Sequence, residues 1–68
     1  MTVASQVKQT IASLKGTRST LETFYSFEED EHSKTLLQQS SQQIGHVIGQ
    51  LEKRVKALEF EEPQYKGF

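Results

Sequence analysis

Residues 37–58, LQQSSQQIGHVIGQLEKRVKAL, indicate the fold most directly, because a mostly apolar series recurs in them at alternating steps of three and four. This spacing aligns side chains along one side of an α-helix. Residues 4–25, ASQVKQTIASLKGTRSTLETFY, repeat the pattern. Nowhere does the sequence sustain the strict alternation of apolar and polar residues that is typical of a strand. The sequence therefore predicts an all-α protein with two helices.

Each segment contains one such series, which we call a seam. The first seam consists of Ala4, Val7, Ile11, Leu14, Arg18, Leu21 and Tyr25, and the second consists of Leu37, Ser41, Ile44, Ile48, Leu51, Val55 and Leu58. The apolar members other than Ala4 are the predicted core and dimer contacts. Arg18 and Ser41 interrupt the seams, and polar residues at such positions lower stability but can select register and oligomeric state. For Arg18 we favour extension of the side chain to the surface, toward Glu22 four residues later.

The helices are expected at about residues 3–26 and 31–59, within a helical hairpin that spans residues 1–60. A short connection is expected near Phe27–Asp30, because Glu28 stands where the first seam would place its next apolar residue. Thr2 is suited to cap the first helix. The acidic residues at the start of the second helix favour the positive end of its dipole.

Asp30 or Ser33 is expected to cap the second helix. Pro63 lies beyond that helix, and the tail, residues 61–68, is expected to be irregular and extended. The connection contains neither glycine nor proline, so a second arrangement stays open. In it the two helices join into one long rod that exchanges between chains.

A short connection makes the two helices antiparallel neighbours. Two helices share one narrow contact, and a core of that size hardly offsets the loss of conformational entropy. Several apolar residues outside the seams would stay partly exposed in a monomer, namely Val3, Phe24, Leu36, Val47 and Phe60. Pairing two hairpins would bury both sets. We therefore expect a homodimer in the form of a four-helix bundle.

Composition limits the function. The chain has 68 residues, a formal net charge of -1 and no cysteine, so it has neither a disulfide framework nor a thiol nucleophile. A nearly neutral protein is a poor binder of nucleic acid. No apolar run approaches the roughly 20 residues that cross a bilayer, and no signal peptide opens the sequence. We expect a soluble intracellular protein without a nucleic-acid partner.

No constellation of residues predicts catalysis. Glu28 and Glu29 lie four and three residues before His32, a spacing found in di-iron bundles, but such sites need two of these motifs. We interpret this cluster as a solvated helix start, with adventitious divalent-ion binding as the alternative. His46 has no nucleophile or carboxylate at a helical offset. The sequence predicts no enzyme, cofactor, metal site or small-molecule substrate.

Three further features keep two readings each. Gly45 and Gly49 are either tolerated on a wet helix face or mark a close helix contact across the dimer. The basic residues Lys53, Arg54 and Lys56 form a solvated face or contact anionic lipid. The aromatic residues Phe60, Tyr65 and Phe68 either dock on a bundle or are presented to another protein as a recognition segment.

Four stretches together resemble a known family: MTVASQVKQT at 1–10, ASLKG at 12–16, TLET at 20–23 and LEFEEPQYKGF at 58–68. They are similar to the domain of unknown function 1657 family, which comprises short proteins of endospore-forming bacteria. Members are often encoded beside spore membrane proteins, including stage V sporulation channel proteins. The resemblance implies a role in spore resistance or germination. No catalytic or ligand residues are established for the family, so it assigns none to this chain.

We therefore expect a non-catalytic, spore-associated interaction protein that is an accessory to a membrane protein. The expected location is the forespore or spore, with the inner membrane surface as one site. The alternative function is a peripheral binder of anionic lipid surfaces.

Overall fold

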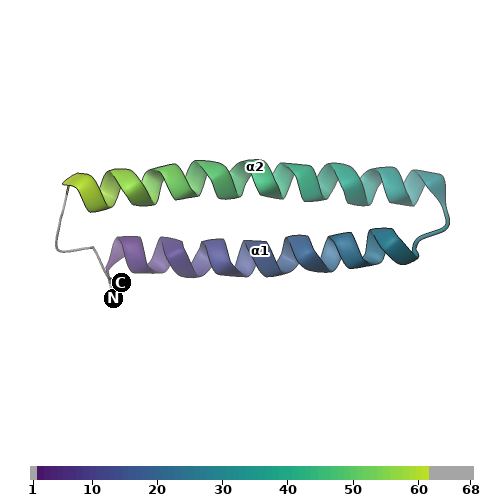
Figure 1. Ribbon diagram of the computed structural model, residues 1–68, viewed down its shortest axis with the longest axis horizontal. Helices are drawn as coiled ribbons and strands as arrows, with labels where there is room; N and C mark the ends of the chain where they lie inside the picture. Colours follow the sequence, from purple (N-terminus) through teal and green to yellow (C-terminus); the bar gives the residue numbers. More distant parts are fainter. Residues whose placement is uncertain (1, 62–68) are drawn as a thin grey trace.

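The computed structural model describes residues 2–61. This part of the chain forms two helices and no strand, α1 (Val3–Phe27) and α2 (Glu31–Glu61). The helices lie side by side and antiparallel, and the molecule measures 48 × 16 × 11 Å (Figure 1). The predicted all-α helical hairpin is therefore confirmed.

The ends of α1 follow from its capping residues. The backbone N–H of Ser5 donates to the Thr2 hydroxyl at 3.1 Å, and this bond satisfies one of the amides that the first turn leaves unpaired. At the other end, the N–H of Glu28 donates to the carbonyl of Phe24 at 2.9 Å. This bond extends the helix through Phe27, one residue beyond the expected end.

The connection consists of residues 28–30 and is held by carboxylates. Glu28 Oε1 accepts from the N–H of Asp30, and Asp30 Oδ2 accepts from the N–H of Ser33 at 2.8 Å. Asp30, and not Ser33, therefore caps α2. The hydrogen bond from the Ser33 backbone is the main cause that lowers the pKa of Asp30.

The chain thus turns back on itself and has the hairpin rather than the continuous rod. α2 continues through Glu61, two residues beyond the expected end. Glu31 lies in its first turn, where a negative charge favours the helix dipole.

The core follows the two seams and is thin. Ile11, Ile48 and Val55 form the buried cluster, and Val7, Leu14, Ile44 and Leu51 pack against it partly buried. Ala4 and Leu58 are also buried, toward the end of the hairpin opposite the connection. Within residues 2–61, no large side chain is completely buried. The half-buried seam residues therefore keep part of their apolar surface accessible to solvent in a single chain.

Candidate interaction surface

The apolar seam residues lie between the helices and are buried to different extents. Ile11, Ile48, Val55 and Leu58 are buried, whereas Val7, Leu14, Leu21, Leu37, Ile44 and Leu51 are half-buried. Tyr25, next to the connection, is 36% exposed, and the Lys34 ammonium lies 5.2 Å from the centre of its ring. This is a cation–π contact that ties the first turns of α2 to the last turns of α1.

Of the three aromatic residues assigned to a tail contact, Phe60 is the last large side chain of α2 and is 87% exposed. Tyr65 and Phe68 lie outside the described residues.

One broad face of the hairpin carries the ion pairs between the helices. Lys8 Nζ lies 3.4 Å from Glu59 Oε2, and Lys15 Nζ lies 3.5 Å from Glu52 Oε2. Each of these residues immediately follows a seam residue. We call the residues that follow seam residues the ion-paired face: Ser5, Lys8, Ala12, Lys15, Ser19, Glu22 and Ser26 on α1, and Gln38, Gln42, Gly45, Gly49, Glu52, Lys56 and Glu59 on α2.

Arg18 also reaches this face. Its Nε lies 3.8 Å from Glu22 Oε1, so the side chain leaves the seam toward a surface carboxylate. A Cβ added to Gly45 would lie 3.3 Å from Arg18 Nη1, whereas one added to Gly49 would meet no atom within 4 Å. The close approach at Gly45 is therefore made within the hairpin, to Arg18.

The opposite broad face has another composition. A step back of one residue turns an α-helix by about 100°, and in antiparallel helices this turn leads to the same side of the pair. The residues that immediately precede seam positions are almost all uncharged. The uncharged face consists of those from Val3 to Gln50, together with Phe27 and Ser33, which continue the same spacing toward the connection: Val3, Gln6, Thr10, Ser13, Thr17, Thr20, Phe24 and Phe27 on α1, and Ser33, Leu36, Ser40, Gln43, Val47 and Gln50 on α2. Arg54 and Ala57 also precede seam residues, beyond the end of this face.

The uncharged face also holds most of the exposed apolar surface. Seven large apolar residues are exposed in the described part of the chain, and five of them, Val3, Phe24, Phe27, Leu36 and Val47, belong to this face. On α2 the same series reaches charged residues only at Arg54 and Glu61. A contiguous surface with apolar side chains and without charge is typical of a contact site for another protein.

A groove between the helices runs into the uncharged face. Leu14, Ser40, Gln43, Ile44 and Val47 line it, and its volume is about 290 Å³. Half-buried seam residues are therefore accessible from this side, where a knob from a partner helix can reach them.

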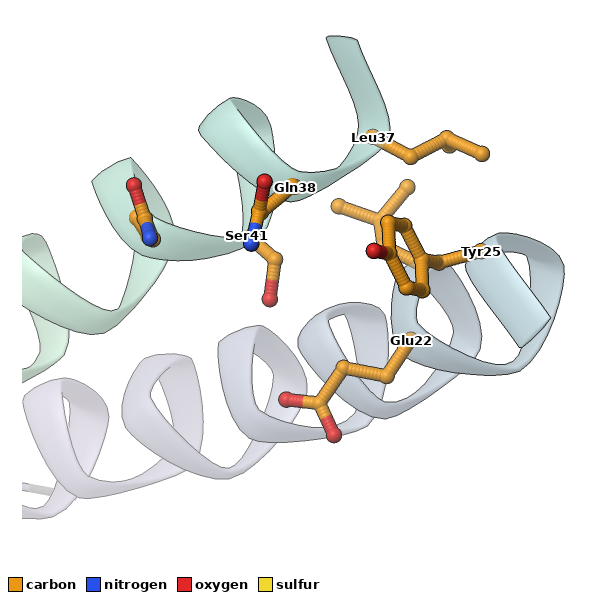
Figure 2. Close-up of a pocket in the computed structure, with 7 residues that line it drawn as sticks. Glu22, Tyr25, Leu37, Gln38 and Ser41 are labelled. Carbon is orange, nitrogen blue, oxygen red and sulfur yellow. The ribbon is translucent and has the colours of Figure 1, made fainter. Parts of the chain in front are cut away.

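A second cleft lies between the helices near the connection, with a volume of about 210 Å³. Figure 2 shows the Tyr25 ring between the helices and the Ser41 hydroxyl directed toward α1. Serine is too short to fill its place in the seam, and this leaves the cleft. Its volume is below the roughly 300–1,000 Å³ of pockets that hold drug-sized ligands, so we assign it no ligand.

The remaining candidates lie apart from one another. Glu28 is engaged in the connection, and Glu29 and His32 are exposed there. No group of three or more His, Asp or Glu side chains in residues 2–61 is placed to hold a metal ion. His46 lines a shallow hollow with glutamines of the same helix.

The basic residues of α2 do not share one side of the helix. Arg54 and Lys56 are two residues apart, which corresponds to about 200° around the helix axis. Arg54 therefore continues the uncharged series, whereas Lys56 belongs to the ion-paired face.

Sequence reasoning found the seams but not the difference between the two faces. The signal was present, since the residue before each seam residue is uncharged from Val3 to Gln50. Val3, Phe24, Leu36 and Val47 share this position before a seam residue, whereas Phe60 does not.

Within residues 2–61, neither helix has an apolar stretch long enough to cross a membrane. Comparison with curated proteins found no match, and comparison with solved structures found none either. A family model described as "Protein of unknown function (DUF1657)" matches residues 7–55. This range covers both seams except for their outermost residues at the end opposite the connection. The chain therefore belongs to the DUF1657 family.

Proposed function

We propose that this protein is a non-catalytic interaction protein that works as a homodimer, in which two hairpins pack through their uncharged faces into a four-helix bundle. The observation that carries the proposal is the separation of charge from exposed apolar surface. The interhelical ion pairs lie on one face, while five exposed large apolar side chains lie on the other.

The dimensions of the face fit this partner. A hairpin 48 Å long and 16 Å wide offers close to the roughly 800 Å² that each partner contributes to an interface of standard size. A second copy presents the same threonine, serine and glutamine side chains, which can pair by hydrogen bonds without burying a charge. It also covers the groove that exposes Leu14 and Ile44.

The resemblance to the family supports the proposed cellular role. Its members are proteins of endospore-forming bacteria often encoded beside spore membrane proteins, and this supports a role as an accessory to such a protein in spore resistance or germination. The dimer acts in the forespore or spore, at the inner membrane surface. After dimerisation, the ion-paired faces and the outer sides of the helices are left for that membrane protein.

The alternative, a binder of anionic lipid, is less well supported because only Lys53 and Lys56 share a side of α2, whereas Arg54 lies on another side. Co-sedimentation with vesicles of anionic phospholipid distinguishes the two functions. An accessory that requires its protein partner stays in the supernatant, whereas recovery in the pellet at physiological salt would favour the lipid binder.

Fluorescence microscopy tests the cellular role. A fusion to a fluorescent protein is expected to concentrate at the forespore during sporulation. Uniform signal in the mother cell, with none in the forespore, would overturn the proposed location.

A further inference from the structure

Three of the five exposed large apolar side chains of the uncharged face lie at one end. Phe24 and Phe27 lie in the last turns of α1, and Leu36 lies in the second turn of α2. These three side chains are 55%, 78% and 59% exposed. We call them the loop-end apolar cluster, because the connection joins the two helices at this end.

The opposite end of the face is more polar. It contains Val3, Gln6 and Gln50, and beyond Gln50 the series on α2 continues with Arg54. The uncharged face is therefore directional, with an apolar end at the connection and a polar end far from it.

A two-fold dimer brings this face against its own copy in one of two orientations. If the two connections lie at the same end, each loop-end apolar cluster meets the other. If they lie at opposite ends, each cluster meets the end that carries Gln6 and Arg54. The first orientation packs six large apolar side chains against one another, whereas the second places each set of three against one valine, Val3, and otherwise against amides and a guanidinium.

We infer that the two hairpins pair with their connections at the same end of the four-helix bundle, so that the two loop-end apolar clusters pack against each other. The inference rests on the proposed function, because it specifies how the second copy sits on the uncharged face. A two-fold axis parallel to the helices then places α1 of one copy beside α2 of the other. All neighbouring helices run antiparallel, and the Arg54 side chains lie at the opposite end of the bundle.

Distance measurement between spin labels tests this orientation. The chain has no cysteine, so Glu29→Cys introduces one labelling site at an exposed residue of the connection. With both connections at one end, the labels are separated by on the order of 20–30 Å, since packed helices lie about 8–10 Å apart and the label arms add to this distance. With the connections at opposite ends, the separation approaches the 48 Å length of the hairpin.

The molar mass of the labelled protein is also measured by light scattering. This measurement distinguishes failure of the proposed orientation from failure of the proposed homodimer. A dimer mass with the short distance supports the inference. A dimer mass with the long distance overturns the orientation but leaves the proposed homodimer intact. A monomer mass without dipolar coupling overturns both. His32→Cys, at an exposed residue in the first turn of α2, is a second labelling site with the same expected contrast, and an excess of unlabelled chain is expected to remove the coupling.

Discussion

The two broad faces of this hairpin belong to the same two helices but differ in their side chains. On the ion-paired face, Lys8 and Lys15 of α1 meet Glu59 and Glu52 of α2, and no side chain on this face is apolar and larger than alanine. The uncharged face carries phenylalanine, leucine and valine together with hydroxyl and amide side chains. Ion pairs at the surface contribute little to the free energy of unfolding. Their main effect is therefore to keep the ion-paired face charged and hydrated. This difference is the reason why we propose that a second copy covers the uncharged face.

The largest effect is expected where a charge enters the uncharged face. Val47 lies near the middle of α2, and Val47→Lys would bring a lysine from each copy into the contact. Burial of unpaired like charges costs several kcal/mol, so we expect the dimer dissociation constant to rise about a hundredfold. Sedimentation velocity across a concentration series measures it.

Gln42→Lys is the matched control, since Gln42 is an exposed residue of the ion-paired face. This variant is expected to leave the dissociation constant within about twofold of that of the wild type. Equal weakening by both substitutions would show that the two faces are not distinguished in the dimer.

A smaller effect, of opposite sign, is expected from glycine on the ion-paired face. Gly49 has open space around it, so Gly49→Ala removes backbone freedom from the unfolded chain without a clash. We expect the free energy of unfolding to rise by up to about 1 kcal/mol, with the dimer retained. Urea unfolding at a fixed chain concentration measures the change.

Gly16→Ala, also in open space, is the control for this helix-propensity effect. If Gly49 lies against a second copy, Gly49→Ala would instead weaken the dimer while Gly16→Ala would not. That outcome would show that the dimer contact is on the ion-paired face and not on the uncharged face.

The cap of α2 belongs to neither face and is expected to supply a pH dependence at the connection. The pKa of Asp30 is lowered in the folded state, so its contribution to stability is present above the ordinary aspartate pKa and is lost as the pH falls through the lowered value. Asp30→Ala is therefore expected to lower the melting temperature at neutral pH. The difference from the wild type should shrink in acid.

Asp30→Asn separates charge from hydrogen bonding, because asparagine keeps an oxygen that accepts from the N–H of Ser33. This variant is expected to melt between the wild type and Asp30→Ala at neutral pH. If the difference in melting temperature between the wild type and Asp30→Ala stays constant down to strong acid, the ionised carboxylate of Asp30 is not the source of the stabilisation.

The smallest effect is expected from an ion pair itself. Glu52→Gln removes the partner of Lys15, and both side chains are about half exposed. We expect the free energy of unfolding to fall by no more than about 0.5 kcal/mol, with an unchanged dimer mass. A large loss of dimer would mean that the ion-paired face takes part in the contact.

The seams and the first cap could be predicted from sequence because both depend on residues close together in the chain. The spacing of Ile44, Ile48 and Leu51 places them on one side of a helix, and Thr2 bonds to an amide three residues later. The choice of Asp30 over Ser33 could not be predicted, since either side chain can cap a helix. It depends on where the chain leaves α1.

The contacts between the two helices could not be predicted from the sequence, because they depend on the register between the helices. That Lys8 faces Glu59, and that Arg18 lies over Gly45, follows from how far α2 is shifted along α1. This shift cannot be predicted from the sequence of either helix alone. The uncharged face, by contrast, does not depend on this shift, because its residues are set by their position before seam residues and by the antiparallel direction of the helices.

The account depends most directly on whether a second copy covers that face. Light scattering of the wild-type chain, over a wide range of concentrations at neutral pH and physiological salt, is the measurement that tests this. The account predicts a stable mass near twice 7.8 kDa. A mass of 7.8 kDa throughout, with a fully helical circular dichroism spectrum, would contradict it.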